Sequence, residues 1–155
     1  MKNIRLKKQV LDRYLRRIRK EVSVHFVSEK KMEELNGNGS RTVIGLYDPN
    51  LPKRIYVENT LPNYTKLNVL LHEYGHFLHD MDECKCSAFH NRKLSNPVLC
   101  EIHAERYCLS KLHNDQMWEC LKIEKRLLKK NWDNFPHSQA LKRLMKSKTW
   151  KLRRK

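Results

Sequence analysis

The stretch LNVLLHEYGHFLHD, residues 67–80, decides how the rest of the sequence is interpreted. His72 and His76 are four residues apart, so both imidazoles project from one side of a helix. Apolar residues recur at helical spacing along another side, which predicts a helix with one buried face. This predicted stripe consists of Leu67, Leu70, Leu71, Tyr74, Phe77 or Leu78, and Met81.

His72, Glu73 and His76 together form the pattern HExxH. Two histidines at this spacing can hold one Zn²⁺ at about 2.0–2.1 Å. Glu73 can then act on a water molecule as a general base without ligating the metal itself. Because only three residues are fixed, the pattern also arises by chance, and the other interpretation is a histidine-rich amphipathic helix. The surrounding sequence has to separate the two interpretations.

A third metal ligand is the feature that would favour zinc, since catalytic zinc takes three protein ligands and leaves one position for water. The segment PVLCEIHAERYCLSKL, residues 97–112, predicts a helix that begins at Pro97. Glu101 and Glu105 lie four residues apart on one side of it. The first carboxylate can bind zinc, and the second can accept the other ring N–H of a ligand histidine. Two ordinary exposed glutamates are the alternative, but carboxylates on an otherwise apolar helix need a reason.

The order of predicted elements indicates an α+β fold, with a helix, a small antiparallel sheet and then helices only. Residues 1–20 are expected to form a basic N-terminal helix, 21–115 the core and 116–155 basic C-terminal helices, all in one compact domain. In the segment SEKKMEELNGNG, Ser28 is expected to cap the start of a helix, and Gly37 and Gly39 are expected to end it. Glycine and proline mark most of the other boundaries. Strands are predicted at residues 22–27, 41–48 and 54–59, and helices at 4–20, 28–39, 61–81, 97–113, 115–131 and 135–150.

The run IGLYDPNLPKRIYVENTLPNYTKLNVLLHEYGHFLHD, followed by EIHAERYCLSKL, resembles the ImmA/IrrE-type zinc metallopeptidases, a group of gluzincins. The resemblance covers roughly residues 42–113. It implies a minimal zincin-like fold and one Zn²⁺ per chain, bound by His72, His76 and Glu101. It also implies Glu73 as the general base and Glu105 as the residue that orients a ligand.

The same resemblance implies an intracellular endopeptidase that cleaves a protein or peptide substrate. Substrates in that family are often DNA-binding repressors, and many members come from phages and mobile elements. The cysteine-containing loop at residues 82–96 and the basic C-terminal helices depart from the family pattern. The substrate therefore stays open.

Several residues leave alternatives open at the site. An oxyanion donor is needed, and Tyr107, His103 and Tyr64 are the candidates. His90 lies fourteen residues after His76, near the third histidine of SprT-type proteases, which act on proteins crosslinked to DNA. That interpretation replaces Glu101 by His90. The remaining histidines that could compete as ligands are His79, His103 and His113.

The five cysteines are an odd number, and in a reducing cytosol thiols or metal ligands are favoured over disulfides. Cys84, Cys86 and Cys100, together with His90, could hold a second, structural metal. Their C-x-C spacing is tighter than the usual C-x₂₋₄-C, so thiols are the favoured interpretation. The other two cysteines, Cys108 and Cys120, are predicted to lie in the core.

Charge is concentrated at the two ends of the chain, whose formal net charge is +16. Residues 1–20 hold nine basic and one acidic residue, and residues 121–155 hold thirteen basic and two acidic ones. Basic segments of this kind bind phosphate backbones, because binding releases counterions from the nucleic acid. Non-specific contact with nucleic acid is therefore one prediction. Trp150, which lies among the basic residues of the C-terminal segment, suits a stacked nucleobase or an anionic surface. The alternatives are a solvated basic face, or a non-enzymatic binding module on a zincin fold.

No apolar run approaches the roughly 18 residues that a membrane helix needs. The first twenty residues are basic but lack the apolar stretch and cleavage site of a secretory signal. We therefore expect a cytoplasmic protein without a membrane partner.

Overall fold

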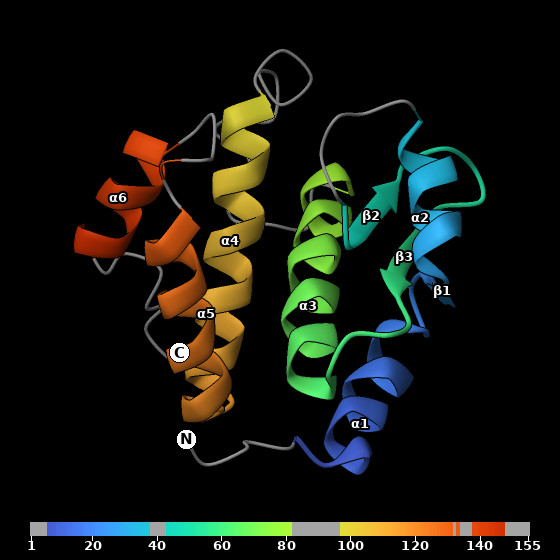
Figure 1. The fold of residues 1–155 in the computed structure, drawn as a ribbon, viewed down its shortest axis with the longest axis horizontal. Helices are drawn as coiled ribbons and strands as arrows, with labels where there is room; N and C mark the ends of the chain where they lie inside the picture. Colours follow the sequence, from blue (N-terminus) through green and yellow to red (C-terminus); the bar gives the residue numbers. More distant parts are fainter. Residues whose placement is uncertain (1–5, 38–42, 82–96, 132, 134–137, 148–155) are drawn as a thin grey trace. The chain divides into compact units, whose positions relative to one another are not determined.

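The computed structural model describes residues 6–37, 43–81, 97–131, 133 and 138–147. Within these ranges the chain is α+β, with six helices and one three-stranded sheet (Figure 1). It divides into two compact units, Met1–Phe77 and Leu78–Lys155. The predicted boundaries at residues 20 and 115 stay a prediction. No helix in the described ranges combines the length and apolar character needed to cross a membrane.

The first unit begins with α1, Lys8–Ile18, whose two sides differ sharply in polarity. Its apolar residues follow the i, i+3, i+4, i+7 spacing of a single buried stripe. They are Leu11, Tyr14, Leu15 and Ile18, all buried. Arg13, Arg16 and Arg17 lie on the exposed side. The basic character of this segment is thus a property of one helix face, while the other face is core.

Strands β1, Ser23–Val27, β2, Gly45–Asp48, and β3, Arg54–Glu58, form the sheet in the order β1-β3-β2. β2 and β3 pair antiparallel, as expected for a hairpin, but β1 and β3 pair parallel. The predicted antiparallel sheet is therefore wrong, and the sheet is mixed. A tight turn fixes only the β2–β3 pairing, whereas β1 is separated from both by a helix, and such a crossover permits parallel pairing.

β3, which contains the segment RIYVE, is the central strand of the sheet, and this position decides whether it can bind an extended substrate by strand addition. An extended substrate can add to a sheet only at an edge with unpaired backbone groups. Both edges of β3 are occupied, by β1 through pairs such as Ile55 with Val24 and by β2 through pairs such as Ile55 with Tyr47. β3 is an inner strand, and it cannot accept a further one.

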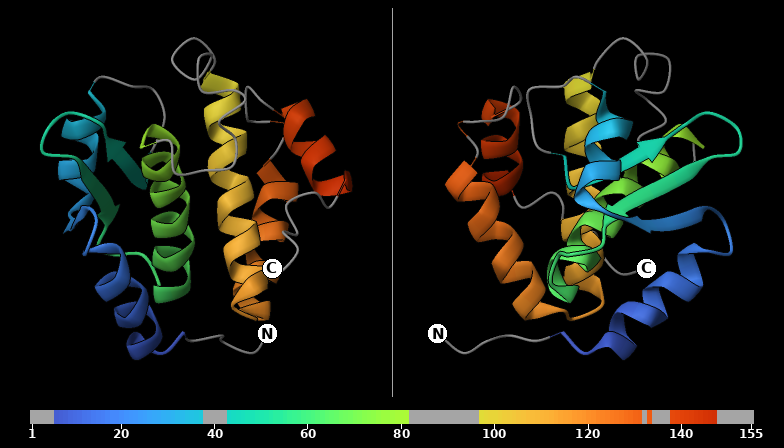
Figure 2. Two further views of the ribbon diagram at one scale, coloured as in Figure 1. Left: turned by 180° about the vertical axis from the view of Figure 1, so that it is seen from behind. Right: turned by 45° about the vertical axis from the view of Figure 1, so that its right-hand side comes forward.

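Helix α2, Glu29–Asn36, has the predicted start and stop. The Ser28 hydroxyl accepts a hydrogen bond from the Lys31 backbone N–H at 3.2 Å, which satisfies one of the first N–H groups. Gly37 ends the helix with φ of +68°, a left-handed backbone that favours glycine. Met32 is buried, and α2 packs on β2 and β3 (Figure 2).

Helix α3, Asn63–Asp80, contains the HExxH pattern. The predicted stripe is confirmed for its first five positions, since Leu67, Leu70, Leu71, Tyr74 and Phe77 are buried. Met81 does not belong to it, because α3 ends at Asp80 and the Met81 side chain is exposed.

Two contacts within the first unit fix the rotation of α3 about its axis. The Tyr74 hydroxyl donates a hydrogen bond of 2.8 Å to Glu21 Oε1, in the segment between α1 and β1. The Phe77 ring packs edge-on against the Tyr47 ring of β2, with 6.1 Å between centroids. These contacts tie two successive turns of α3 to two separate segments of the first unit.

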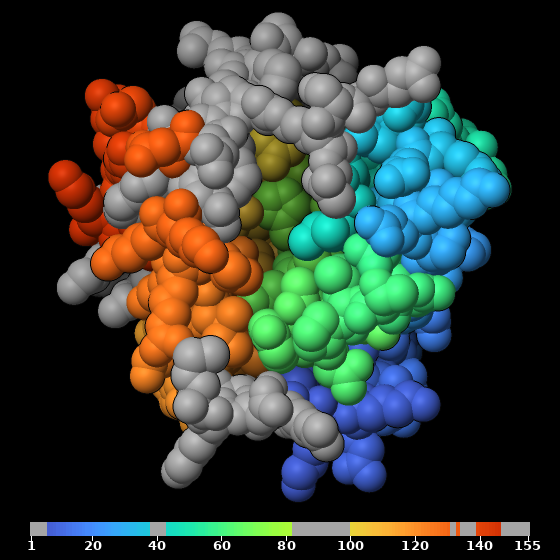
Figure 3. All heavy atoms as spheres, in the orientation of Figure 1, coloured from blue at the N-terminus to red at the C-terminus, as the bar shows by residue number. Residues whose placement is uncertain are grey.

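The second unit contains α4, Pro97–Asn114, α5, Trp118–Asn131, and α6, Ser138–Ser147. α4 begins at Pro97 as predicted, and it packs against both α5 and α6. Atoms of α5, coloured orange, form part of the surface in Figure 3. The described core of this unit is made of Ala104, Cys108, Leu109, Leu112, Cys120, Leu121, Leu128, Leu141 and Leu144.

The turn between α4 and α5 reverses the chain with two backbone hydrogen bonds. The Met117 N–H donates to the Leu112 carbonyl at 2.8 Å, and the Gln116 N–H donates to the His113 carbonyl at 3.1 Å. This is the Schellman arrangement, in which the residue after the helix is left-handed. Gln116 has φ of +58°, at a position where glycine is the usual residue.

We predict that Gln116→Gly stabilises the protein. A left-handed conformation costs a residue with a Cβ roughly 1–2 kcal/mol, and glycine loses about 0.5–1 kcal/mol more backbone entropy on folding. The free energy of unfolding should therefore rise by about 0.5–1 kcal/mol, measured from the urea midpoint at constant slope. Gln9→Gly, in helical α1, is the matched control and should lower it. A fall in stability with Gln116→Gly would contradict the left-handed turn.

Candidate metal centre

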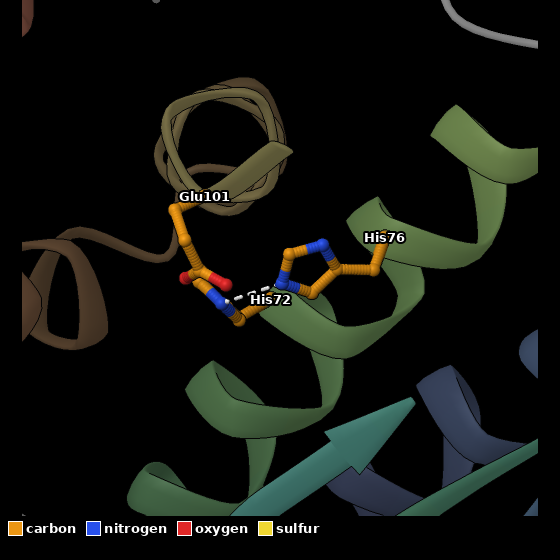
Figure 4. Close-up of side chains that lie close together, drawn as sticks. All are labelled: His72, His76 and Glu101. Atoms are coloured by element: carbon orange, nitrogen blue, oxygen red, sulfur yellow. Dashed lines mark hydrogen bonds between the residues drawn. The ribbon is translucent and has the colours of Figure 1, made fainter. Parts of the chain in front are cut away.

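His72 and His76 lie one turn apart on α3, and their rings converge (Figure 4). The two Nε2 atoms are 3.2 Å apart, and the rings are nearly perpendicular, at 80° with centroids 4.8 Å apart. The stripe that buries the opposite side of α3 holds the helix in this orientation. The pair is thus presented by a packed helix and not by a loop.

The separation of the two nitrogens fits a shared zinc ion. Two nitrogens bound at about 2.05 Å with a tetrahedral angle between them are roughly 3.3 Å apart. The 3.2 Å between the Nε2 atoms is close to this value. The same distance suits an Nε2–H···Nε2 hydrogen bond between the two rings. The imidazoles can therefore stay paired without a metal and bind one without changing their separation.

Glu73 follows His72 directly, and its side chain is buried, with 8% of its surface exposed. β2 approaches it closely at Gly45, the first residue of that strand. A Cβ built on Gly45 would lie 2.3 Å from Val69 Cγ1 and 2.9 Å from Glu73 Oε1. Only a residue without a side chain allows the β2 backbone to lie this close to the carboxylate.

Gly45 was not among the candidate site residues. An isolated glycine within a strand pattern signals a close backbone approach, and the sequence RTVIGLYD contains that signal. What the sequence does not show is which groups lie against this glycine. They are Val69 and Glu73, which lie 24 and 28 positions further along the chain.

Glu101 lies in the second turn of α4, and its side chain is half-buried. Within the described ranges, one group of three metal-ligating side chains can hold an ion, namely His72, His76 and Glu101 (Figure 4). Two imidazole nitrogens and one carboxylate oxygen are a donor set found in catalytic zinc sites. Imidazole donors suit transition-metal ions better than magnesium or calcium, which prefer oxygen ligands alone.

Glu105 is buried on α4, with 8% of its surface exposed, which is rare for a glutamate. It influences Cys108, one turn further on. Burial raises the pKa of the Cys108 thiol well above its ordinary value, and the charges of Glu124 and Glu105 raise it further. Cys108 therefore stays protonated and acts as a core residue.

Cys120 behaves in the same way as Cys108. Burial, followed by the charge of Glu119, raises the pKa of its thiol. Both residues are almost completely buried, which confirms their predicted place in the core. Cys100 is a half-buried thiol on α4. Cys84 and Cys86, the other members of the second metal site considered above, lie outside the described residues.

The other histidine and tyrosine candidates occupy several places. His79 and His103 are both buried in the second unit, and their rings lie against each other with a tilt of 32° and centroids 4.6 Å apart. Tyr64 is in the first turn of α3, about 12 Å along the helix axis from His72. Tyr107 is half-buried on α4. The placement of Tyr107, His103 and Tyr64 does not single out one of them as the oxyanion donor. His90 lies outside the described residues.

Comparison with protein-family models gives no match, and neither curated proteins nor solved structures give a significant one. The assignment of chemistry to this chain therefore rests on the side chains of α3 and α4.

We predict that Gly45→Ala destabilises the protein and disturbs the Glu73 carboxylate. The new methyl group overlaps Val69 and Glu73, and overpacking of this kind costs about 1–3 kcal/mol. Adding Val69→Ala should recover part of the loss, because Val69 Cγ1 is the nearest atom. Chemical denaturation of the two single variants and the double variant measures this coupling.

Gly37→Ala is the control for Gly45→Ala. A Cβ at Gly37 meets nothing within 4 Å, so its cost comes from the left-handed backbone alone. Val69→Ala should leave that cost unchanged. Equal recovery at both positions would show that β2 does not approach α3 as described.

Proposed function

We propose that this protein is a zinc-dependent endopeptidase. The observation that carries the proposal is the pair of imidazoles on α3, with Nε2 atoms 3.2 Å apart, directly beside a buried glutamate. Chance occurrences of HExxH do not require converging rings or a glycine that admits the neighbouring strand to the carboxylate. The resemblance to ImmA/IrrE-type peptidases over roughly residues 42–113 also favours this function.

In this proposal His72, His76 and Glu101 hold the metal. When bound, zinc supplies a Lewis acid that polarises the scissile carbonyl and makes water more acidic. Glu105, four residues after Glu101, is proposed to orient a ligand imidazole through its second ring nitrogen. A protein or peptide substrate is implied, and a DNA-associated protein such as a repressor is the substrate class suggested by the resemblance.

Glu73 carries the proton in the proposed reaction. Its carboxylate accepts the proton of the attacking water and returns it to the nitrogen of the departing amine, so one group serves as base and then as acid. The close approach of β2 at Gly45 restricts the positions open to the carboxylate. The Glu73 side chain therefore needs little rearrangement before this proton transfer.

We predict about one zinc per chain in protein purified without chelator, measured by elemental mass spectrometry. His72→Ala and His76→Ala should each weaken zinc binding by more than about 100-fold, because loss of a residue that merely orients a ligand already costs about 10–100-fold. His25→Ala, on the exposed side of β1, is the control and should bind zinc normally. Zinc-free protein that takes up none on addition would reduce the site to a histidine-rich helix.

The third ligand is tested by comparing two further variants. Glu101→Ala should weaken zinc binding as strongly as the histidine variants, whereas His90→Ala should leave it unchanged. The reverse result would favour the SprT-type arrangement, with His90 as ligand and DNA–protein crosslinks as substrate. Two zinc ions per chain would instead reopen the structural site at Cys84, Cys86 and Cys100.

We predict that Glu73→Gln keeps the zinc and loses hydrolysis. Removing a general acid–base lowers the rate by about 10²–10⁴-fold, while the isosteric amide preserves packing against β2. The measurement is cleavage of a peptide library by the zinc-loaded variant, alongside zinc stoichiometry. A biological activity that survives this change is not peptide hydrolysis, and the protein would then be a binding module on the same scaffold.

A further inference from the structure

The exposed side of α5 carries basic residues in register with an exposed tryptophan. Trp118, Lys122, Arg126 and Lys129 follow at i, i+4, i+8 and i+11, so they share one side of the helix, and Lys130 borders it. All five side chains are exposed. We call this set the α5 basic face. Glu119, also exposed, is the single acidic residue at its margin.

Trp118 is the feature that distinguishes this face from an ordinary solvated helix surface. Its side chain is 52% exposed, although burying an indole is among the most favourable contributions a side chain can make to a core. The turn at Gln116 places it beside His113, whose ring meets the indole edge-on at 5.2 Å between centroids. The indole is thus held at the start of α5 with a large part of its surface open.

The four basic side chains are available to an external anion. Among the described residues, none of Lys122, Arg126, Lys129 and Lys130 forms an ion pair, whereas Lys142 of α6 is paired with Asp133 at 2.7 Å. The buried side of α5, formed by Cys120, Leu121 and Leu128, fixes the helix on α4. The charges therefore project from a rigid element.

We propose that the α5 basic face binds single-stranded nucleic acid. Lysine and arginine along one side neutralise successive phosphates, and an open indole offers a surface on which an unpaired base can stack. Bases in a duplex already have both faces covered by their neighbours, so Trp118 favours a single strand. This site is independent of the metal centre and of the reaction proposed for it.

An anionic membrane surface fits the α5 basic face less well. Helices that lie on membranes insert a continuous apolar side below their charged side. The apolar side of α5 is buried in the second unit, and Leu127, its other exposed apolar residue, lies about 180° around the helix from Trp118. A single indole beside four charges lacks the apolar area for insertion.

The test measures binding of a fluorescent oligothymidylate of about 12 nucleotides, a length within the usual range of site sizes. Trp118→Ala should weaken binding about tenfold, in line with the loss of one stacked base. Trp118→Phe should lose less, and Trp118→Leu, which keeps apolar area without an aromatic face, should behave like Trp118→Ala. Equal binding by wild type and Trp118→Ala would overturn the proposal.

The charges are tested against a matched set on α1. Changing Lys122, Arg126 and Lys129 together to glutamine should make the negative slope of log K against log salt shallower by about 2, or about 0.7 per phosphate contact. Changing Arg13, Arg16 and Arg17 to glutamine removes the same charge from a helix whose single aromatic residue, Tyr14, is buried on the other side. That variant should keep the wild-type slope. Equal losses from both sets would indicate attraction to net charge alone and would overturn the site.

Two further probes separate the partner classes. A duplex of the same length and vesicles rich in phosphatidylserine should bind more weakly, and their binding should not depend on Trp118. Tighter, Trp118-dependent binding of either would overturn the assignment to single strands. With Trp132 and Trp150 changed to phenylalanine, Trp118 is the single tryptophan of the chain. Quenching of its emission by the oligothymidylate is expected on stacking, and unchanged emission in the bound state would contradict it.

Discussion

The rotation of α3 about its own axis is the constraint on which the rest of the structure depends. Leu67, Leu71 and Tyr74 face the core, and the same helical periodicity brings His72 and His76 together on the opposite side of the helix. A rotation by the angle of one residue, about 100°, would bury an imidazole and expose a leucine. The Tyr74–Glu21 hydrogen bond opposes that rotation from outside the helix. Packing and chemistry are therefore fixed by the same set of contacts.

Local sequence patterns predict the features of this fold that depend on neighbouring residues. The start of α2 at Ser28, its stop at Gly37 and the start of α4 at Pro97 each follow from one residue type and its own backbone. The HExxH pair is equally local, because four residues make about one turn. These predictions succeed because no distant part of the chain has to be placed for them to hold.

The features that the sequence does not predict depend on distant segments. The parallel pairing of β1 with β3 follows from the path of the chain through α2, which no local pattern encodes. The exposure of Trp118 depends on which side of α5 is covered by α4. Gln116 is left-handed although glutamine has no side chain suited to that region, so the chain reversal imposes the conformation. Helical spacing places Glu101 only relative to other residues of α4. Its prediction as a ligand of the same metal as His72 and His76 therefore also needed the family resemblance.

Gly45 has a consequence for how the sheet assembles. Successive side chains of a strand alternate between faces, so a slip of β2 by one residue would exchange every inward and outward position. Such a slip would also bring Ile44 or Leu46 to the point where only a hydrogen atom fits against Val69 and Glu73. Because Gly45 has no side chain, only one register of β2 fits against Val69 and Glu73, and registers shifted by one residue are excluded by steric overlap. Gly45 thus determines the register of the strands as well as the space around the Glu73 carboxylate.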